Sequence, residues 1–549
     1  MKKSILMLLL CGLLINTASA QQNSNQSVQF DNVMNGSFPS DAPGATVLVS
    51  RQGQIIYKKA FGMANMELPV AMQADNIFKI GSITKQFTAV AILQLWEQGK
   101  LDLQDEITKY IPDYPTQGSK ITIEHLVTHT SGIRNHTSIP DTVQRSRIDF
   151  TPKQMIDFFK NQPMRFAPGT KWEYSNSNYT ILGYIIEKIT GKTYAQYLDE
   201  NIFKPLGMNN SLYADDAKII KNRVEGYTKP GKEIENAPYL SMTHPYAAGA
   251  ILSTVTDMFK WNQALKSYKL LKKETLDRAW SRYKLSDGSY ANYGYGWRMG
   301  YIQGAPSIWH GGLVQGFKAM ALYLPAEDVY VTVLTNCDYS FPEDIAAKLA
   351  AIAIAKPYDV KEISIDGKIL AQYVGVYDNG KGQKRVVSAT GKQLFAQLNR
   401  APKVPVKAWQ QDKFFFAEDP MQTMEFTRNS KGEVEKLIVS NRTAIETWTK
   451  TNSPLPLEDG IKVDEKILDT YVGKYEIAPE FHFTVTKEKG RLFVEPTGQE
   501  KFEIFAETES KFFLKINDAQ LEFAKDASGK VVKVILIQGG RKTDAKKIN

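Results

Sequence analysis

Apolar runs separated by polar turns fill the first 356 residues, and they predict strands at both ends of this region. Apolar runs at 45–50 and 55–57, joined by a glycine turn, predict a β-hairpin. Runs at 319–324 and 330–335 predict a second antiparallel pair, and a helix is expected over 342–356. We therefore expect one antiparallel sheet that both ends of the region build, with helices around it.

The middle of the same region has the pattern of helices. Apolar residues from Ala89 to Trp96 precede Gly99, and small and hydroxyl residues come before them, which is typical of a helix with its start and stop signals. Further helices are predicted over 181–189 and 249–266. Together with the strands, they indicate an α+β (mixed α/β) fold with a helical subdomain.

Beyond Pro357 the pattern changes to short, aromatic-rich strands, and it repeats after 98 residues. The segment 369–377 recurs as 467–475, and Leu394-Phe395 recurs as Leu492-Phe493. Repetition of short strands with this spacing predicts two small β-barrel-like modules. We expect the first at 366–450 and the second at 464–549, after a larger domain at 30–356.

The first twenty residues have the pattern of a secretory signal peptide. Lys2 and Lys3 precede an apolar run at 5–15, and Ala18-Ser19-Ala20 offers a cleavage site. No later segment has the apolar length of a transmembrane helix. We expect an exported protein, periplasmic or extracellular, without a transmembrane segment.

Charge and ligand-forming residues exclude several function classes. The 68 Lys and Arg against 59 Asp and Glu give a net charge of +9, spread thinly and without a basic run interleaved with aromatics, so nucleic acid is not an expected partner. His125 and His129 stand four apart, but Leu126 occupies the position where a zinc protease needs glutamate. We expect no metal and no cofactor. After cleavage Cys337 is the only cysteine, so an intramolecular disulfide is excluded.

Ser82 and Lys85 are the first candidate catalytic pair. They stand three apart at the start of the helix that precedes Gly99, where residues at this spacing share a face. A serine hydroxyl needs a base to become a nucleophile, and N–H groups at a helix start can stabilise an anion. On its own, S-x-x-K is so short that an N-cap serine followed by a solvated lysine is the better interpretation.

Tyr174 and Asn176 are the second candidate pair. They stand two apart just before a predicted helix, so a phenol and a carboxamide would project to the same side of an extended segment. In isolation they also fit a loop tyrosine and a capping asparagine.

Three motifs follow one another in the chain: Ser82-x-x-Lys85, Tyr174-x-Asn176 and His310-Gly311-Gly312. As a set, they resemble the class C β-lactamase and D-alanyl-D-alanine carboxypeptidase superfamily, the serine peptidase S12 group of β-lactamase-related hydrolases. The resemblance covers roughly residues 40–355. It implies a β-lactamase/transpeptidase-like domain, and the two tail modules resemble the lipocalin-like domains appended to such hydrolases.

The resemblance also implies a role for each residue. Ser82 would attack a carbonyl, Lys85 and Tyr174 would move its proton, and Asn176 would bind a substrate amide. The backbone N–H groups of Ser82 and Leu313 would form the oxyanion hole, and Gly311 and Gly312 would let the strand approach the substrate.

His310 stands where β-lactamases of this group have a lysine that holds the substrate carboxylate. Histidine is only partly charged at neutral pH, so it is a weaker partner for a carboxylate. Two roles stay open for His310, namely contact with a substrate carboxylate and bracing of the strand edge.

We expect a serine hydrolase that acts through an acyl-enzyme on a small-molecule or peptide substrate, cell-wall fragments included. The substrate would be a peptide, a D-amino-acid amide or an ester, as for a D-alanyl-D-alanine carboxypeptidase, a D-aminopeptidase or an esterase. The alternatives are a weak class C-type β-lactamase and a catalytically silent cell-wall or peptide-binding protein.

Overall fold

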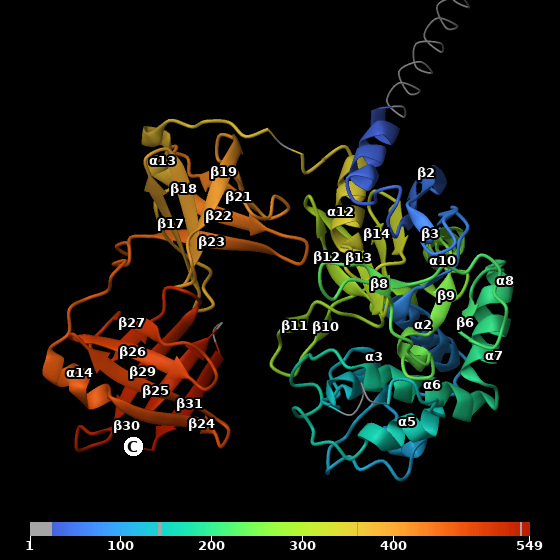
Figure 1. Cartoon of the computed structure of the whole chain (residues 1–549), viewed down its shortest axis with the longest axis horizontal. Helices are drawn as coiled ribbons and strands as arrows, with labels where there is room; N and C mark the ends of the chain where they lie inside the picture. Colours follow the sequence, from blue (N-terminus) through green and yellow to red (C-terminus); the bar gives the residue numbers. More distant parts are fainter. Residues whose placement is uncertain (1–24, 141–144, 360, 539–540, 549) are drawn as a thin grey trace, which may run out of the picture. The chain divides into compact units, whose positions relative to one another are not determined.

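The computed structural model describes residues 25–140, 145–359, 361–538 and 541–548, and the predicted signal peptide at 1–20 lies outside them. The chain divides into two compact units, Met1–Tyr358 and Asp359–Asn549 (Figure 1). The first holds a six-stranded sheet with helices, and the second holds two barrels.

The sheet of the first unit is antiparallel, and both ends of the unit build it. Its strand order is β12-β13-β14-β15-β1-β2, so the N-terminal hairpin joins the C-terminal strands through the pairing of β1 with β15. This arrangement confirms the predicted sheet. The strands are β1 (Ala45–Arg51), β2 (Gln54–Phe61), β12 (Arg298–Ile302), β13 (Ala305–Val314), β14 (Phe317–Leu324) and β15 (Val329–Thr335).

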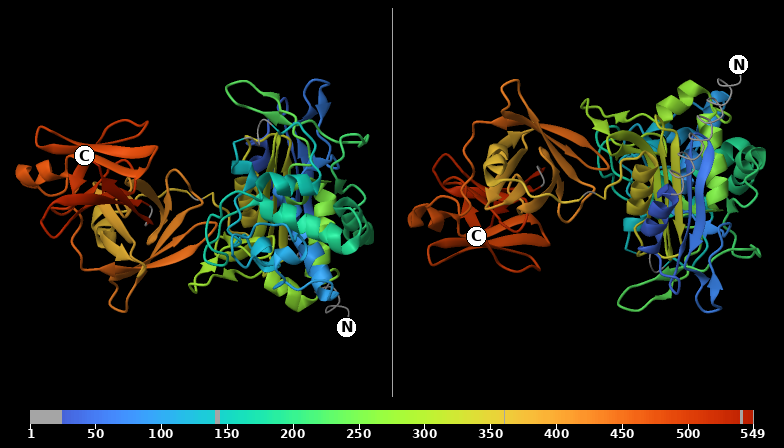
Figure 2. Two further views of the ribbon diagram at one scale, coloured as in Figure 1. Left: turned by 90° about the horizontal axis from the view of Figure 1, so that it is seen from below. Right: turned by 90° about the horizontal axis from the view of Figure 1, so that it is seen from above.

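Helices cover both faces of this sheet (Figure 2). Every residue of the central strand β15 is buried, and neighbouring residues of a strand point to opposite faces. Leu334 and Tyr330 pack in the same core as helix α10 (Val255–Lys266), whereas Val331 and Val333 point to the other face. Helix α12 (Pro342–Ala353) also packs against β14 and β15, and its residues do not belong to that core.

The helical part of the unit lies between β2 and β12 in the sequence. Helix α6 begins at Asn176, and the residue after its last, Gly191, has a φ of 69° that glycine adopts without strain. Its helices besides α10 are α2 (Thr84–Glu97), α3 (Ile123–Val127), α5 (Pro152–Phe159), α6 (Asn176–Thr190), α7 (Tyr194–Leu198), α8 (Lys204–Leu206), α9 (Tyr246–Gly249) and α11 (Lys273–Ala279). Small sheets pair β3 (Met63–Asn65) with β4 (Val70–Ala71), β7 (Tyr227–Thr228) with β8 (Glu235–Asn236), and β10 (Tyr283–Lys284) with β11 (Tyr290–Ala291).

One predicted helix begins later than expected. Residues 249–266 were predicted as a single helix, but Ile251–Ser253 form strand β9, and α10 starts only at Val255. Strand β9 pairs with β5 (Phe78–Lys79) on one side and β6 (Leu212–Tyr213) on the other. Burial explains the difference, because all three residues of β9 lie in the interior. A short, fully buried apolar run has no polar positions whose spacing could distinguish a strand from a helix.

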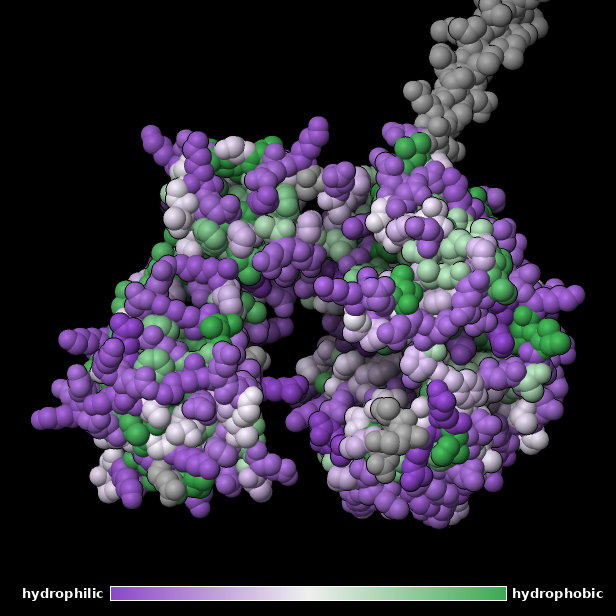
Figure 3. Space-filling view, in the orientation of Figure 1, coloured by the Kyte–Doolittle hydropathy of each residue, from purple (hydrophilic) through white to green (hydrophobic). Residues whose placement is uncertain are grey.

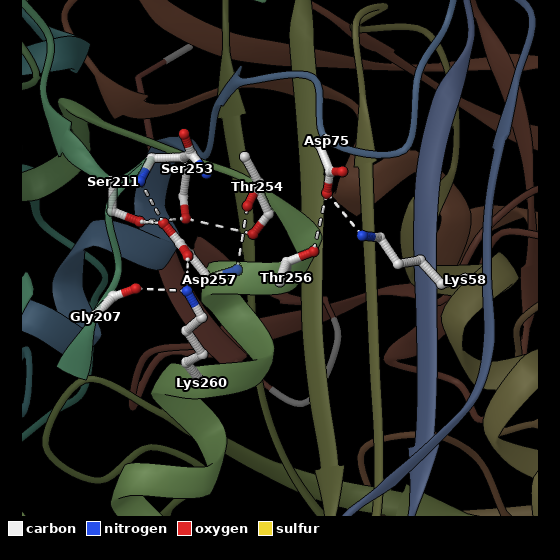
Figure 4. Close-up of polar contacts among 10 residues, drawn as sticks. Lys58, Asp75, Gly207, Ser211, Ser253, Thr254, Thr256, Asp257 and Lys260 are labelled. Atoms are coloured by element: carbon white, nitrogen blue, oxygen red, sulfur yellow. Dashed lines mark hydrogen bonds and ion pairs between the residues drawn. The ribbon is translucent and has the colours of Figure 1, made fainter.

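A buried carboxylate anchors α10 beside this small sheet (Figure 4). Asp257 is fully buried, and its Oδ2 accepts hydrogen bonds from the Asn210 N–H at 2.8 Å and the Ser211 hydroxyl at 3.1 Å. Its Oδ1 lies 3.0 Å from the Nζ atom of Lys260. Because β9 also pairs with β5, this network helps to fix the segment that leads into Ser82.

The second unit consists of two closed barrels of eight antiparallel strands, as the sequence repeat predicted. The first barrel has α13 (Gly367–Tyr373), β16 (Gly375–Asp378), β17 (Lys384–Thr390), β18 (Gln393–Leu398), β19 (Val404–Gln410), β20 (Lys413–Phe416), β21 (Thr423–Arg428), β22 (Val434–Ser440) and β23 (Ile445–Thr451). The second has α14 (Glu465–Tyr471), β24 (Gly473–Ala478), β25 (Phe481–Glu488), β26 (Arg491–Pro496), β27 (Phe502–Ala506), β28 (Lys511–Phe513), β29 (Ala519–Lys525), β30 (Val531–Gln538) and β31 (Arg541–Lys547).

Apolar side chains form the buried cores of the protein. The face shown in Figure 3 is mostly hydrophilic, with scattered apolar residues. Each barrel has its own core, separate from the core of the first unit. No helix in the described ranges is long and apolar enough to cross a membrane.

Candidate active site

Ser82 lies at the point where the start of α2 meets strand β13. It occupies a single helical turn, η1 (Gly81–Ile83), that leads directly into α2. A Cβ atom on Gly312 would lie 1.9 Å from the Ile80 carbonyl oxygen, and one on Gly81 would lie 2.6 Å from the Leu313 nitrogen. Only glycine at both positions permits this approach, which brings the backbone N–H groups of Ser82 and Leu313 together.

The amine of Lys85 lies beside the Ser82 hydroxyl in a fully buried position. Its Nζ atom is 3.1 Å from Ser82 Oγ, 2.8 Å from Asn176 Oδ1 and 2.8 Å from the Ala248 carbonyl oxygen. No carboxylate of the described chain lies within ion-pair distance of it. Burial, aided by the positive charge of Arg298, holds the pKa of Lys85 well below its ordinary value.

The three contacts of Lys85 constrain where its protons lie. The Asn176 and Ala248 oxygens can only accept hydrogen bonds, so they take two N–H groups of the amine. The lowered pKa of Lys85 favours its neutral amine form. In that form, the third position on Nζ is a lone pair, and it faces Ser82 Oγ. Neutral Lys85 can therefore accept the proton of the serine.

Tyr174 has the opposite tendency. Burial raises the pKa of its phenol, although a hydrogen bond with Ser82 and the charge of Arg298 oppose that rise. The Lys85 Nζ atom lies 4.8 Å from the centroid of the Tyr174 ring. The raised pKa keeps the Tyr174 phenol protonated at neutral pH, and the lowered pKa of Lys85 favours its neutral form, a pairing that suits an acid and a base.

Arg298 is a cation that sequence reasoning did not select. Its guanidinium carbon lies 5.4 to 5.8 Å from the centroids of four aromatic rings, Trp172, Tyr174, Tyr293 and Trp309. No carboxylate among the described residues pairs with it. The aromatic faces attract the cation, and its uncompensated charge acts on Lys85 and Tyr174. An arginine at the start of an apolar strand gives no local signal of this role.

His129 holds the segment around Tyr174 in place. Its ring Nδ1 accepts a hydrogen bond from the Ser175 N–H at 3.2 Å, and its carbonyl oxygen accepts one from Glu173. The imidazole centroid lies 4.4 Å from that of Tyr174.

Across the described part of the chain, no group of three or more His, Cys, Asp or Glu side chains could hold a metal ion.

His310 is buried, and both of its ring nitrogens have partners within the protein. Nδ1 donates to the Gly311 carbonyl oxygen at 2.6 Å, and Nε2 lies 3.0 Å from the Tyr293 hydroxyl. Burial, together with the nearby charges of Lys85 and Arg298, lowers the pKa of His310 well below its ordinary value. The neutral ring can thus accept the Tyr293 proton at Nε2, and it is not among the residues that line the cavity at Ser82.

A cavity of about 430 Å³ opens next to Ser82. Of the predicted site residues, Ser82, Asn176 and Leu313 line it, whereas Lys85 lies beneath it in the core. The other lining residues are His136, Thr137, Ser146, Leu240, His244, Pro245, Ala248, Gly249, Val314, Gln315 and Asp338. This volume suits a small organic substrate.

Comparison with known proteins agrees with this geometry. The profile of the beta-lactamase family matches residues 34–356, which is more than half of the chain. The chain belongs to the beta-lactamase family. Residues 359–451 and 457–546, which contain the barrels of the second unit, each match a domain family of unknown function (DUF3471).

Relatives in this family include penicillin-binding proteins and a peptidase. The chain is 27% identical over 410 residues to penicillin-binding protein 4* of Bacillus subtilis, covering 70% of this chain and 89% of that protein. It is 26% identical over 335 residues to a D-aminopeptidase of Gluconobacter oxydans, covering 59% of this chain and 60% of that protein. A solved structure of an octameric penicillin-binding protein homologue from Pyrococcus abyssi has a TM-score of 0.54 at 25% identity, covering 78% of this chain and 99% of the other. The protein is thus a serine hydrolase of the beta-lactamase family.

Proposed function

We propose that the protein hydrolyses amide, peptide or ester bonds through an acyl-enzyme on Ser82. The observation that carries the proposal is the bonding of Lys85, whose two obligatory acceptors leave its lone pair directed at the Ser82 hydroxyl. A buried amine with no carboxylate partner is poised to act as a base rather than as a structural cation.

In the first half of the reaction, Lys85 takes the Ser82 proton while Oγ attacks the substrate carbonyl. The backbone N–H groups of Ser82 and Leu313 stabilise the oxyanion that forms. Tyr174, which keeps its proton at neutral pH, protonates the leaving amine or alkoxide. Water then attacks the acyl-enzyme in the second half, with the proton passing back through the same groups.

We propose that Asn176 both orients Lys85 and binds the substrate. Its side-chain oxygen accepts from Lys85 at 2.8 Å, and the residue also lines the cavity. Its amide N–H groups are therefore available to a substrate carbonyl.

For His310 we propose the bracing role. A neutral ring bonded to Tyr293 and Gly311 supports the edge of β13 rather than a substrate carboxylate. Efficient β-lactam turnover is also disfavoured, because a β-lactam carboxylate needs a cationic partner. None of the described residues that line the cavity is a lysine or an arginine. The relative named as a D-aminopeptidase supports a peptide substrate instead.

The proposal is tested by comparing Ser82→Ala with Ser267→Ala, which changes an exposed serine at the end of α10. On a p-nitrophenyl ester and a D-amino-acid amide, Ser82→Ala should lower kcat by roughly 10⁴-fold, and Ser267→Ala should leave it unchanged. If Ser82→Ala keeps a substantial fraction of the activity, the proposed mechanism is wrong. Complete inactivity of folded wild-type protein would favour the catalytically silent binding protein.

We also propose that the protein is exported after cleavage of residues 1–20. The basic start, apolar run and small residues before Gln21 support this. Expression of the full chain with a native N-terminus should yield secreted protein that begins at Gln21, as read by N-terminal sequencing. Retention of Met1 on secreted protein would contradict the proposal.

A further inference from the structure

The cavity at Ser82 carries a charge that the proposed mechanism does not use. Asp338 is the only Asp, Glu, Lys or Arg among its described lining residues. No lysine or arginine of the described chain pairs with it. A lone carboxylate in a partly enclosed cavity favours a cationic group and opposes an anionic one.

The Asp338 carboxylate is held in a fixed position. Its Oδ2 accepts a hydrogen bond from the Gly316 N–H at 3.0 Å, and its own N–H donates to the Tyr227 carbonyl oxygen at 3.2 Å. Gly316 belongs to the tight turn between β13 and β14. The carboxylate is therefore tied to the same strand edge that supplies the Leu313 N–H, and its second oxygen remains for a ligand.

With Tyr174 as the proposed acid for the leaving group, the lining residues indicate that the cavity takes the acyl side of the scissile bond. Tyr174, which would protonate the leaving group, is not among the described lining residues, whereas Leu313, Val314 and Gln315 are. The cavity thus follows β13 away from Tyr174, and the part of the substrate that stays on Ser82 occupies it.

The separation between Leu313 and the turn after β13 indicates which amine Asp338 can reach. Two residues, Val314 and Gln315, lie between Leu313 and Gly316, so these positions are at most about 10 Å apart. The α-amine of an aminoacyl group lies roughly 2.5 Å from its carbonyl carbon, so it stays close to the oxyanion hole. The residues that line the cavity include Leu240, Pro245, Ala248 and Val314, whose apolar side chains suit a chain of methylene groups.

We propose that this enzyme prefers acyl groups that end in a protonated amine several bonds from the scissile carbonyl, and that Asp338 binds that amine. This inference rests on the proposed function, because it assumes acylation of Ser82. It names a specificity-determining residue and a substrate class, and it goes beyond cleavage of amides in general.

The test compares the p-nitroanilides of 6-aminohexanoate and 6-hydroxyhexanoate, which have the same length and differ in charge. Wild-type enzyme should prefer the amine by about tenfold in kcat/KM, as expected for a charge-assisted hydrogen bond. Asp338→Asn keeps an oxygen for the Gly316 N–H and should remove the preference for the amine over the hydroxy substrate. Asp216→Asn, which removes a carboxylate outside the cavity, should keep it. The anilide of D-alanine, whose amine is too short, should respond little to Asp338→Asn.

The outcomes separate this inference from the proposed function. Two results overturn the role of Asp338 and leave Ser82-dependent turnover intact. One is an unchanged preference of Asp338→Asn for the amine over the hydroxy substrate. The other is a loss of kcat/KM for D-alanine p-nitroanilide as large as the loss for the 6-aminohexanoate anilide. Turnover that survives Ser82→Ala defeats the proposed function itself. If the wild type cleaves neither anilide, the two compounds are compared as competitive inhibitors of p-nitrophenyl acetate turnover, and equal inhibition overturns the proposal.

Discussion

At the scale of single residues, the candidate site combines a cation without a counterion, Arg298, with a buried amine, Lys85. No carboxylate of the described chain forms an ion pair with either. A positive charge close to an amine makes its protonation less favourable, so Arg298 helps to keep Lys85 a base. Removing this charge should therefore change the pH at which the enzyme works.

Arg298→Gln should move the acid limb of the kcat/KM profile for a neutral ester to higher pH, by about one unit. The reason is that Lys85 must be neutral to accept the Ser82 proton, and loss of the Arg298 charge raises the pKa of Lys85. Arg282→Gln, which removes an arginine stacked on Tyr301 away from the site, serves as the control and should leave the limb in place. An acid limb that stays or moves to lower pH in Arg298→Gln would contradict this assignment.

His310 offers a second test at this scale. If the ring only braces β13, His310→Lys should depress turnover of neutral and anionic substrates alike, because the lysine cannot accept the Tyr293 proton. Tyr293→Phe should lower the turnover of neutral and anionic substrates in the same way. The measurement is the ratio of kcat/KM for an acid substrate and a neutral ester at pH 5.5 and pH 8. A ratio that rises for the acid substrate in His310→Lys would restore the carboxylate contact.

At the scale of elements, the sequence predicted most of what carries the site. The hairpin β1–β2, the pair β14–β15 and helix α2 follow from clear apolar patterns, and the S-x-x-K spacing placed Ser82 and Lys85 on one helical surface. Strand β9 and the neighbours of His310 were not predictable, since both depend on contacts between segments far apart in the chain. The role of Arg298 was not predictable for the same reason, because Trp172 and Tyr174 lie far from it in the sequence.

The contact of η1 with β13 gives the prediction at this scale. Gly312→Ala would place a Cβ 1.9 Å from the Ile80 carbonyl oxygen, so the two segments must separate. The Ser82 and Leu313 N–H groups would no longer converge, and kcat should fall by roughly 100-fold or more. Gly231→Ala is the control, because no atom lies within 4 Å of its added Cβ. Full activity in folded Gly312→Ala protein would contradict the proposed oxyanion hole.

At the scale of the whole molecule, the 98-residue repeat predicted two β-barrel-like modules, and the two barrels share matching contacts. The Tyr377 hydroxyl donates to the Tyr373 carbonyl oxygen, and the Tyr475 hydroxyl donates to that of Tyr471 in the same way. Two equal modules therefore follow from the sequence, whereas their role does not, because the repeat specifies packing and names no ligand.

Separate cores in the two units lead to a prediction for truncation. A chain that ends after Tyr358 keeps the complete core of the first unit and every proposed catalytic residue. The truncated chain should react with a small fluorophosphonate at nearly the wild-type rate. Its turnover of larger peptides, or its oligomeric state, should differ from that of the full chain. Loss of labelling in truncated protein with an intact circular dichroism spectrum would mean that the barrels help to build the site.

The central claim is that Ser82 carries the acyl group, with Lys85 as its base. The most direct measurement is peptide mass mapping after brief reaction with p-nitrophenyl acetate and an acid quench. The account predicts one acetyl group per chain, on the peptide that holds Ser82, with none on that peptide in Ser82→Ala and slow acetylation in Lys85→Met. An acetyl group on a different residue, or acetylation of Ser82→Ala at the wild-type rate, would contradict it.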